Sequence, residues 1–110
     1  MTAGRYRKKP VEIEAARIVV SLAVVDGSDE FDKNAESIAA ISSWMLRNGC
    51  KHFRVHGERA PFGIAIPTLE GVMIADPGDW IIRGVKGEFY PIKDAIFRET
   101  YEAVAEDATR

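Results

Sequence analysis

A dense run of turn and strand signals between Pro77 and Pro91 constrains the fold more than any other part of the chain. Pro77 and Gly78 suit the two central positions of a type II turn, because proline sets the first φ and glycine accepts the positive φ of the second. Residues that favour strands then flank a Gly-Val-Lys-Gly loop at 84–87. The sequence therefore predicts a C-terminal antiparallel β-hairpin over residues 79–91.

The first strand of this hairpin carries apolar side chains on both of its faces. In an extended chain, Trp80 and Ile82 point to one side, whereas Ile81 and Arg83 point to the other. Such a strand lies either in the middle of a sheet with both faces covered or at an interface between molecules. A homodimer is therefore one of the assemblies that the sequence predicts.

One long helix is predicted over residues 34–48. Asn34 is a favourable N-cap, and Gly49 suits the left-handed position that ends a helix. Between them, apolar side chains recur at helical spacing and form one stripe, at Ile38, Ile41 and Met45. We expect this stripe to pack on the sheet.

Weaker signals predict the remaining elements. Period-two alternation and short apolar runs predict strands at 11–15, 51–56, 64–69, 72–75 and 100–104, with one helical turn at 94–97. Val11, Ile13 and Ala15 are expected to face a core, and Pro67 marks its segment as an edge strand or a bulge. The expected fold class is α+β, with one main helix packed on a mostly antiparallel sheet of about five to six short strands.

The size and composition of the chain fit a small globular protein. Its 110 residues predict one domain, with residues 1–5 and 105–110 frayed at the two ends. No apolar run approaches the roughly 18–20 residues that cross a bilayer, which predicts a cytoplasmic protein without a membrane partner. Cys50 is the only cysteine, so no internal disulfide can form. The net charge of −2 gives no overall attraction to nucleic acid.

One group of residues has metal-binding or nucleophilic side chains, namely Cys50, His52 and His56. On an extended strand these positions spread over about 20 Å, so one metal ion cannot collect all three without a sharp bend. The thiol also follows a helix C-terminus, whose partial negative charge raises a thiol pKa. The sequence carries no motif typical of hydrolases or phosphate-binding loops. We therefore expect no metal, no other cofactor and no catalytic residue.

Seven residues are candidates for a ligand or partner surface: His52, Arg54, His56, Arg59, Trp80, Lys86 and Tyr90. They combine cations with amphipathic aromatic rings, and such aromatics and arginines dominate binding hot spots. The leading hypothesis is binding of a protein, through the hairpin face or the segment 50–63. In an alternative, the first four residues line a pocket for a nucleotide or another small molecule. The basic segment 5–9 suits phosphates, although the acidic chain makes a nucleic-acid binder the weaker alternative.

Both ends of the chain resemble a family of small bacteriophage and prophage proteins of unassigned function. The resemblance rests on residues 6–15 (YRKKPVEIEA), on 68–71 and 77–91 (PGDWIIRGVKGEFYP), and on the short motifs at 96–97 and 100–102. The run from 77 to 91 is the most distinctive of these. The resemblance implies a phage origin and a role inside the bacterial host, but it implies no reaction.

The chain departs from this family pattern at two places. Relatives commonly carry a cysteine after the Tyr-Pro pair and then Lys-Pro-Asp, whereas this chain has Ile92 followed directly by Lys93 and Asp94. A role for that cysteine is therefore not open to this protein. Relatives also often have a tryptophan soon after the first strand, where this chain reads Arg-Ile-Val. The resemblance implies that residues 16–63 form the variable, partner-specific part.

Overall fold

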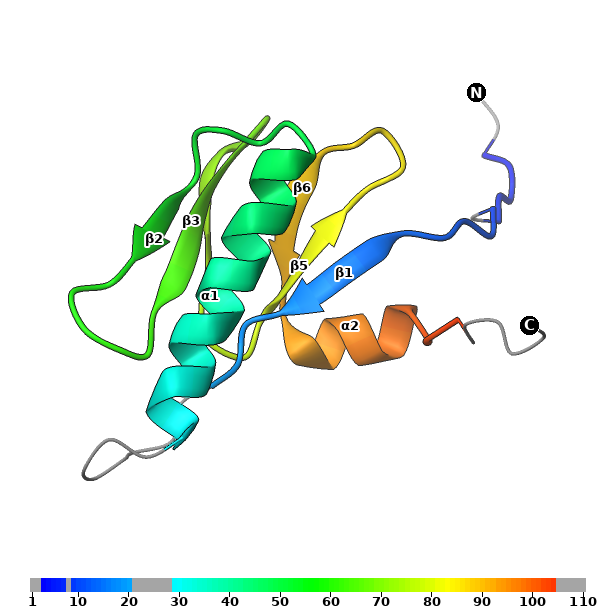
Figure 1. Cartoon of the computed structure of the whole chain (residues 1–110). Coiled ribbons are helices and arrows are strands. Elements are labelled where there is room, and N and C mark those ends of the chain that lie inside the picture. Colours follow the sequence, from blue (N-terminus) through cyan, green and yellow to red (C-terminus); the bar gives the residue numbers. More distant parts are fainter. Residues whose placement is uncertain (1–2, 8, 21–28, 105–110) are drawn as a thin grey trace, which may run out of the picture.

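The structure describes residues 3–7, 9–20 and 29–104, with the backbone alone at 29–32. In this computed structural model the described residues form an α+β fold with two helices and two three-stranded antiparallel sheets (Figure 1). In chain order the elements are β1 (Glu14–Arg17), α1 (Asp29–Arg47), β2 (Arg54–His56), β3 (Gly63–Thr68), β4 (Gly71–Ala75), β5 (Trp80–Arg83), β6 (Phe89–Ile92) and α2 (Asp94–Thr100). The predicted class is confirmed, but the strands form two sheets and not one.

Sheet A consists of β1, β5 and β6, and β5 is its central strand. β5 and β6 form the predicted C-terminal hairpin, in which Trp80 pairs with Ile92. The loop between them closes with a hydrogen bond of 2.9 Å from the amide of Gly87 to the carbonyl of Gly84. The apolar pattern of β5 allowed either a central strand or a strand at an interface, and the structure shows β5 at the centre of sheet A.

The turn before β5 has the predicted type II features. Gly78 has a φ of 94°, in the left-handed region that glycine accepts. The amide of Asp79 donates to the carbonyl of Asp76 at 2.9 Å and closes the turn. The buried Asp79 carboxylate accepts hydrogen bonds from the Asp76 amide at 2.8 Å and from the Lys93 ammonium at 3.0 Å. The turn is therefore tied to the residue that precedes α2.

Sheet B consists of β2, β3 and β4, and β3 is its central strand. β3 and β4 form a tight hairpin in which Thr68 pairs with Gly71. β2 has only three residues and pairs with Gly63–Ala65 in the first half of β3. The prediction of an edge strand or bulge around Pro67 is therefore wrong for β3 as a whole. The proline is tolerated because it lies beyond the end of β2, where no ladder hydrogen bond to that strand is needed.

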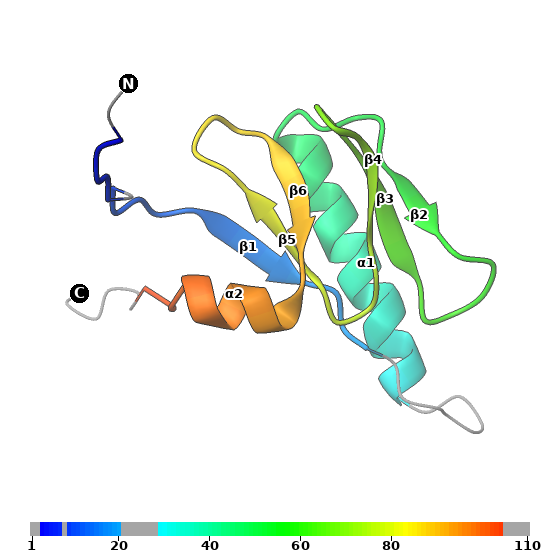
Figure 2. The ribbon, with the colours of Figure 1, turned by 180° about the vertical axis from the view of Figure 1, so that it is seen from behind.

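The main core lies between α1 and the sides of both sheets that face this helix (Figures 1 and 2). The predicted stripe of α1 is confirmed, because Ile38, Ile41 and Met45 are buried. These side chains cluster with residues of both sheets and of the segment after β1, namely Ile18, Ile64, Ile66, Ala75, Ile81 and Phe89. One helix therefore covers one face of each sheet and holds the two sheets together.

The predicted start of this helix is wrong, because α1 begins at Asp29 and Asn34 lies inside it. Asn34 is fully buried and does not cap the helix. Its side-chain amide donates to the carbonyls of Val19 and Phe62 at 2.8 and 3.2 Å, and its side-chain oxygen accepts from the Phe62 amide at 2.8 Å. Asn34 therefore fastens α1 to the chain before it and to the loop before β3. The predicted end is confirmed by Gly49, which follows the helix with a φ of 92°.

Three further predictions need correction. The first strand covers Glu14–Arg17 and not 11–15, so Ala16 packs against the main core instead of Ala15. β2 is shorter than the predicted strand at 51–56. Residues 100–104 do not form a strand, because α2 continues to Thr100 and the chain after it has no regular structure as far as 104. Of the ends predicted to be frayed, 1–2 and 105–110 lie outside the described residues.

The second helix, α2, covers the face of sheet A that points away from α1. Trp80 and Phe97 stack with ring centroids 3.9 Å apart, and the ring of Tyr101 lies 5.3 Å from that of Phe97. The Trp80 indole donates to the carboxylate of Asp94 at 2.8 Å. Ile82, on the same side of β5 as Trp80, is fully buried although it lies outside the main core. Sheet A is therefore covered on both faces.

Candidate functional site

Sheet B differs from sheet A because only one of its faces packs against a helix of the described chain. Ile64 and Ile66 of β3 point toward α1 and are fully buried. α2 lies beside β1, well away from β2 in both views (Figures 1 and 2). The strand register places the alternate side chains of all three strands on the opposite surface. We call this surface the open face, and it consists of Arg54, His56, Ala65, Pro67, Val72 and Ile74.

The centre of the open face is apolar and accessible to solvent. Val72 is 68% exposed and Ile74 is 36% exposed. These two residues pair across the hairpin with Pro67 and Ala65, so the four apolar side chains lie next to one another. Single exposed apolar residues are common on proteins, but adjacent ones form a patch that is typical of a binding surface. The open face can therefore bury apolar side chains of a partner.

Cationic and titratable side chains border this apolar patch. Arg54 and His56 are exposed and belong to β2, an edge strand of the sheet. The segments on either side of β2 add the exposed side chains of Lys51, His52 and Arg59. Glu58 is the only acid between residues 47 and 59. The β2 side of the patch is therefore basic, and it suits carboxylates or phosphates on a partner.

The structure thus places two of the seven predicted residues, Arg54 and His56, on the open face itself, and His52 and Arg59 in the segments beside it. Trp80 is half-buried and engaged with α2. The pKa of the half-buried Tyr90 is raised to about 12, mainly by burial and to a smaller extent by a hydrogen bond with Tyr101. Trp80 and Tyr90 therefore serve to attach the C-terminal segment to sheet A. The remaining candidate, the lysine at position 86, is exposed in the hairpin loop.

The apolar half of the open face is absent from the predicted residues. The four consecutive apolar residues at 72–75 predict a strand, but they do not tell which of its faces another element covers. β5 has the same two-sided apolar character, and there both sides are covered. The signal that could have predicted the apolar half is the lack of alternation at 72–75. A strand with apolar residues on both sides exposes some of them if one face of its sheet is not covered.

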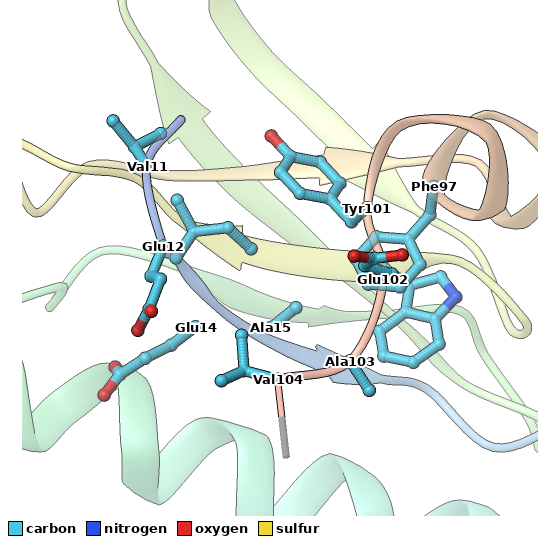
Figure 3. Close-up of a pocket in the computed structure, with 11 residues that line it drawn as sticks. Val11, Glu12, Glu14, Ala15, Phe97, Tyr101, Glu102, Ala103 and Val104 are labelled. Atoms are coloured by element: carbon cyan, nitrogen blue, oxygen red, sulfur yellow. The ribbon is translucent and has the colours of Figure 1, made fainter. Parts of the chain in front are cut away.

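A groove of about 520 Å³ lies at the opposite end of the molecule, between the two ends of the described chain (Figure 3). Residues 11–15 form one wall and 101–104 the other, with the aromatic rings of Trp80 and Phe97 between them. A smaller groove adjoins it, lined by residues 10–11, 98–102 and 104, and two others lie elsewhere. None of these four grooves is lined by the residues predicted for a small-molecule pocket, His52, Arg54, His56 and Arg59.

The structure does not bring Cys50, His52 and His56 together as metal ligands. Among the described residues, no group of three or more His, Cys, Asp or Glu side chains is placed to hold a metal ion. Cys50 packs against the main core, and this burial raises its pKa despite backbone hydrogen bonds from His52 and Phe53 that lower it. The prediction of a raised thiol pKa is correct, but burial is its main cause and not the end of the helix. A thiol with a raised pKa is a weak nucleophile at neutral pH, because only the thiolate reacts.

Comparisons of the chain with models of known protein families, with curated proteins and with solved structures found no match. The resemblance to phage proteins therefore rests on the residues quoted above. Within the described part of the chain, neither helix is long and apolar enough to cross a lipid bilayer.

Proposed function

We propose that the chain is a phage-encoded accessory protein that works in the bacterial cytoplasm, without catalysis, by binding a protein through the open face of sheet B. The observation that carries the proposal is the contrast between the two sheets. Ile82 is fully buried on the face of sheet A that points away from α1, whereas Ile74 and Val72 are exposed on the open face of sheet B. A partner that covers these residues would bury apolar surface that the chain itself leaves in water.

The chemistry of the open face indicates the kind of partner. Apolar side chains of the partner would cover Val72 and Ile74, and carboxylates around them would meet Arg54 and His56. Apolar burial would supply most of the affinity, while the charged border would orient the partner and speed association. A nucleic acid fits less well, because the centre of the patch is apolar and the chain has a net charge of −2. We therefore infer an acidic protein surface.

The phage origin and the location in a bacterial host rest on the resemblance of residues 6–15 and 77–91. The absence of catalysis is supported by Cys50, whose packing against the core disfavours a reactive thiolate. It is also supported by His52 and His56, which lie on the exposed surface around β2 and line none of the four grooves described above.

Site-specific photocrosslinking tests the proposal in bacterial cells that carry the gene. A benzophenone amino acid replaces Val72 on the open face or, as a matched control, Val85, which is 64% exposed in the hairpin loop. We expect one discrete protein adduct from position 72 and no adduct of that mass from position 85. Arg54→Glu should remove the adduct at position 72, because the reversed charge repels carboxylates of the partner.

Equal adducts from the two positions, or an adduct that Arg54→Glu leaves unchanged, would contradict the proposal. An adduct shortened by nuclease would identify a nucleic acid as the partner, and one with the mass of two chains would identify a second copy. A nucleotide screen by thermal shift examines the small-ligand alternative. A ligand at 100 times its Kd stabilises a protein by about 2.7 kcal/mol, and His56→Ala should abolish such a shift if the ligand binds beside β2.

A further inference from the structure

Residues 3–7, 9 and 10 belong to an arm that leaves the domain without joining either sheet. The described residues of this arm are exposed and have no regular secondary structure. Tyr6 is 94% exposed, and its ring lies over Gly4. Arg5 and Arg7 flank this ring. The arm therefore presents an aromatic anchor between two cations and buries none of them, although such a combination is typical of the centre of an interface.

The groove next to the arm has complementary chemistry. Trp80, Phe97 and Tyr101 give it an aromatic surface, and Glu12 and Glu102 contribute exposed carboxylates (Figure 3). The groove also has valines in both walls, at positions 11 and 104. A further acid, at position 99, lines the adjoining groove at the base of the arm, and Arg98 in that groove is already paired with Asp94. An aromatic surface with acidic borders fits a tyrosine that lies between two arginines.

The geometry of the arm directs it away from the groove of its own copy. Residues 11–13 at its base already form one wall of that groove. Pro10 restricts Lys9 to extended conformations, which disfavours a sharp reversal of the chain at this point. Arm and groove lie at the same end of the molecule, beside β1 and α2 and away from β2 (Figures 1 and 2). One two-fold rotation can therefore bring each arm to the groove of the other copy.

We propose that the chain forms a homodimer by arm exchange, in which Tyr6 of each copy enters the groove between residues 11–15 and 101–104 of the other. Arg5 and Arg7 then meet Glu12 and Glu102 across the interface. This contact is independent of the proposed protein partner, because the open face belongs to the other sheet. A dimer formed in this way keeps the open face of both copies accessible.

Sedimentation equilibrium of the full chain and of two charge-reversed variants tests the proposal. The unmodified protein should have the mass of two chains. An arm variant with Arg5→Glu and Arg7→Glu, and a groove variant with Glu12→Lys and Glu102→Lys, should each dissociate at least about a hundredfold more readily, because like charges then face each other. All four changed residues are exposed, so circular dichroism should show an unchanged fold.

The two variants should form a dimer again when they are mixed in equal amounts. In the mixed dimer one reversed arm meets one reversed groove, and one original arm meets one original groove, so both contacts are complementary. Glu70→Lys, an exposed change at the β3–β4 turn, is the matched control and should leave the dimer intact.

Three results would overturn arm exchange. The first is an unmodified chain that stays monomeric up to about 1 mM, a concentration at which even weak specific association is seen. The second is a dimer that persists in both charge-reversed variants, because the interface would then lie elsewhere. The third is a failure of the mixed variants to associate, because arm and groove would then not contact each other. Tyr6→Ala adds a readout without a charge change, since removal of the anchor should also dissociate the dimer.

Discussion

The two sheets of this protein have the same number of strands but differ in what covers them. Sheet A has α1 on one face and α2 on the other, and Ile82 on the α2 side is fully buried. Among the elements that the structure describes, only α1 packs on sheet B, and Val72 and Ile74 on its other face are exposed. Apolar residues on both faces of a short strand therefore have two outcomes. They become a second core where a following element covers them, and a candidate binding surface where none does.

The largest expected effect separates the covered face from the open one. Ile82→Ala should lower the free energy of unfolding by about 2–5 kcal/mol, because it leaves a cavity at a fully buried site. Ile74→Ala should cost about 1 kcal/mol or less, because its side chain already contacts water. Urea unfolding followed by far-ultraviolet circular dichroism measures both. Equal losses would mean that the two faces are covered to a similar extent.

A smaller effect concerns the attachment of α2 to sheet A at low pH. The Trp80 indole and then the Arg98 guanidinium hydrogen-bond to the carboxylate of Asp94 and lower its pKa below the ordinary value of 3.8. A lowered pKa means that ionised Asp94 stabilises the folded protein above that ordinary value. This stabilisation is lost as the pH falls through the lowered pKa.

The indole N–H resonance of Trp80 reports on this contact. We expect it to shift in acid below the ordinary carboxyl range, and Asp94→Asn should remove this shift because an amide does not titrate. Amide resonances of β2 in sheet B should not follow the same titration, because α2 lies beside β1 and well away from β2. An unchanged titration in Asp94→Asn would show that an acid other than Asp94 causes the shift of the indole resonance.

The smallest effect lies at the alkaline end and again concerns sheet A alone. Burial is the main reason why the pKa of Tyr90 is raised to about 12, and the hydrogen bond with Tyr101 adds to it. Because the pKa is raised, neutral Tyr90 stabilises the folded protein fully below the ordinary value near 10. This contribution is lost as the pH rises through about 12.

Ultraviolet difference absorbance follows this ionisation, and Tyr90→Phe identifies its step. Tyr101→Phe should lower the midpoint but keep it above the ordinary value, since burial remains. A step for Tyr90 near its ordinary pKa in the unmodified protein would show that α2 and the chain after it do not shield this ring.

The parts of the fold that could be predicted from the sequence depend on local backbone geometry. The turn at Gly78 and the loop closed by Gly87 follow from residues that accept positive φ, and Gly49 stops α1 for the same reason. Helical spacing also predicts the buried stripe of α1. These signals act over a few residues and need no knowledge of the rest of the chain.

Predictions failed where one residue type serves two purposes. Asn34 has the chemistry of an N-cap, but its side chain is used to bind the backbone of Val19 and Phe62, which lie far from it in sequence. Tyr101 alternates with its neighbours like a strand residue. Its ring instead packs beside that of Phe97, four residues earlier, and Phe97 stacks on Trp80 of sheet A. In both cases tertiary packing outweighs the local preference, for Tyr101 by way of Phe97.

The candidate site was predictable only in its polar half. Exposed cations such as Arg54 and His56 stand out in an alternating strand, and the structure places both on the open face. Val72 and Ile74 carry the same local signal as buried strand residues. The groove at the other end of the molecule was missed because residues 11–15 and 101–104 are distant in sequence and meet only in the folded chain.

The sequence by itself therefore determined the turns, the helical stripe, the C-terminal hairpin and the basic segment around β2. Only the tertiary structure decided that the strands split into two sheets, and that α2 covers one of them but not the other. The physical reason is that turn and helix signals arise from the backbone and side chains of a few neighbouring residues. Burial depends instead on which distant element packs on a face: Ile82 lies on the side of sheet A that α2 covers, whereas Ile74 lies on the open face of sheet B.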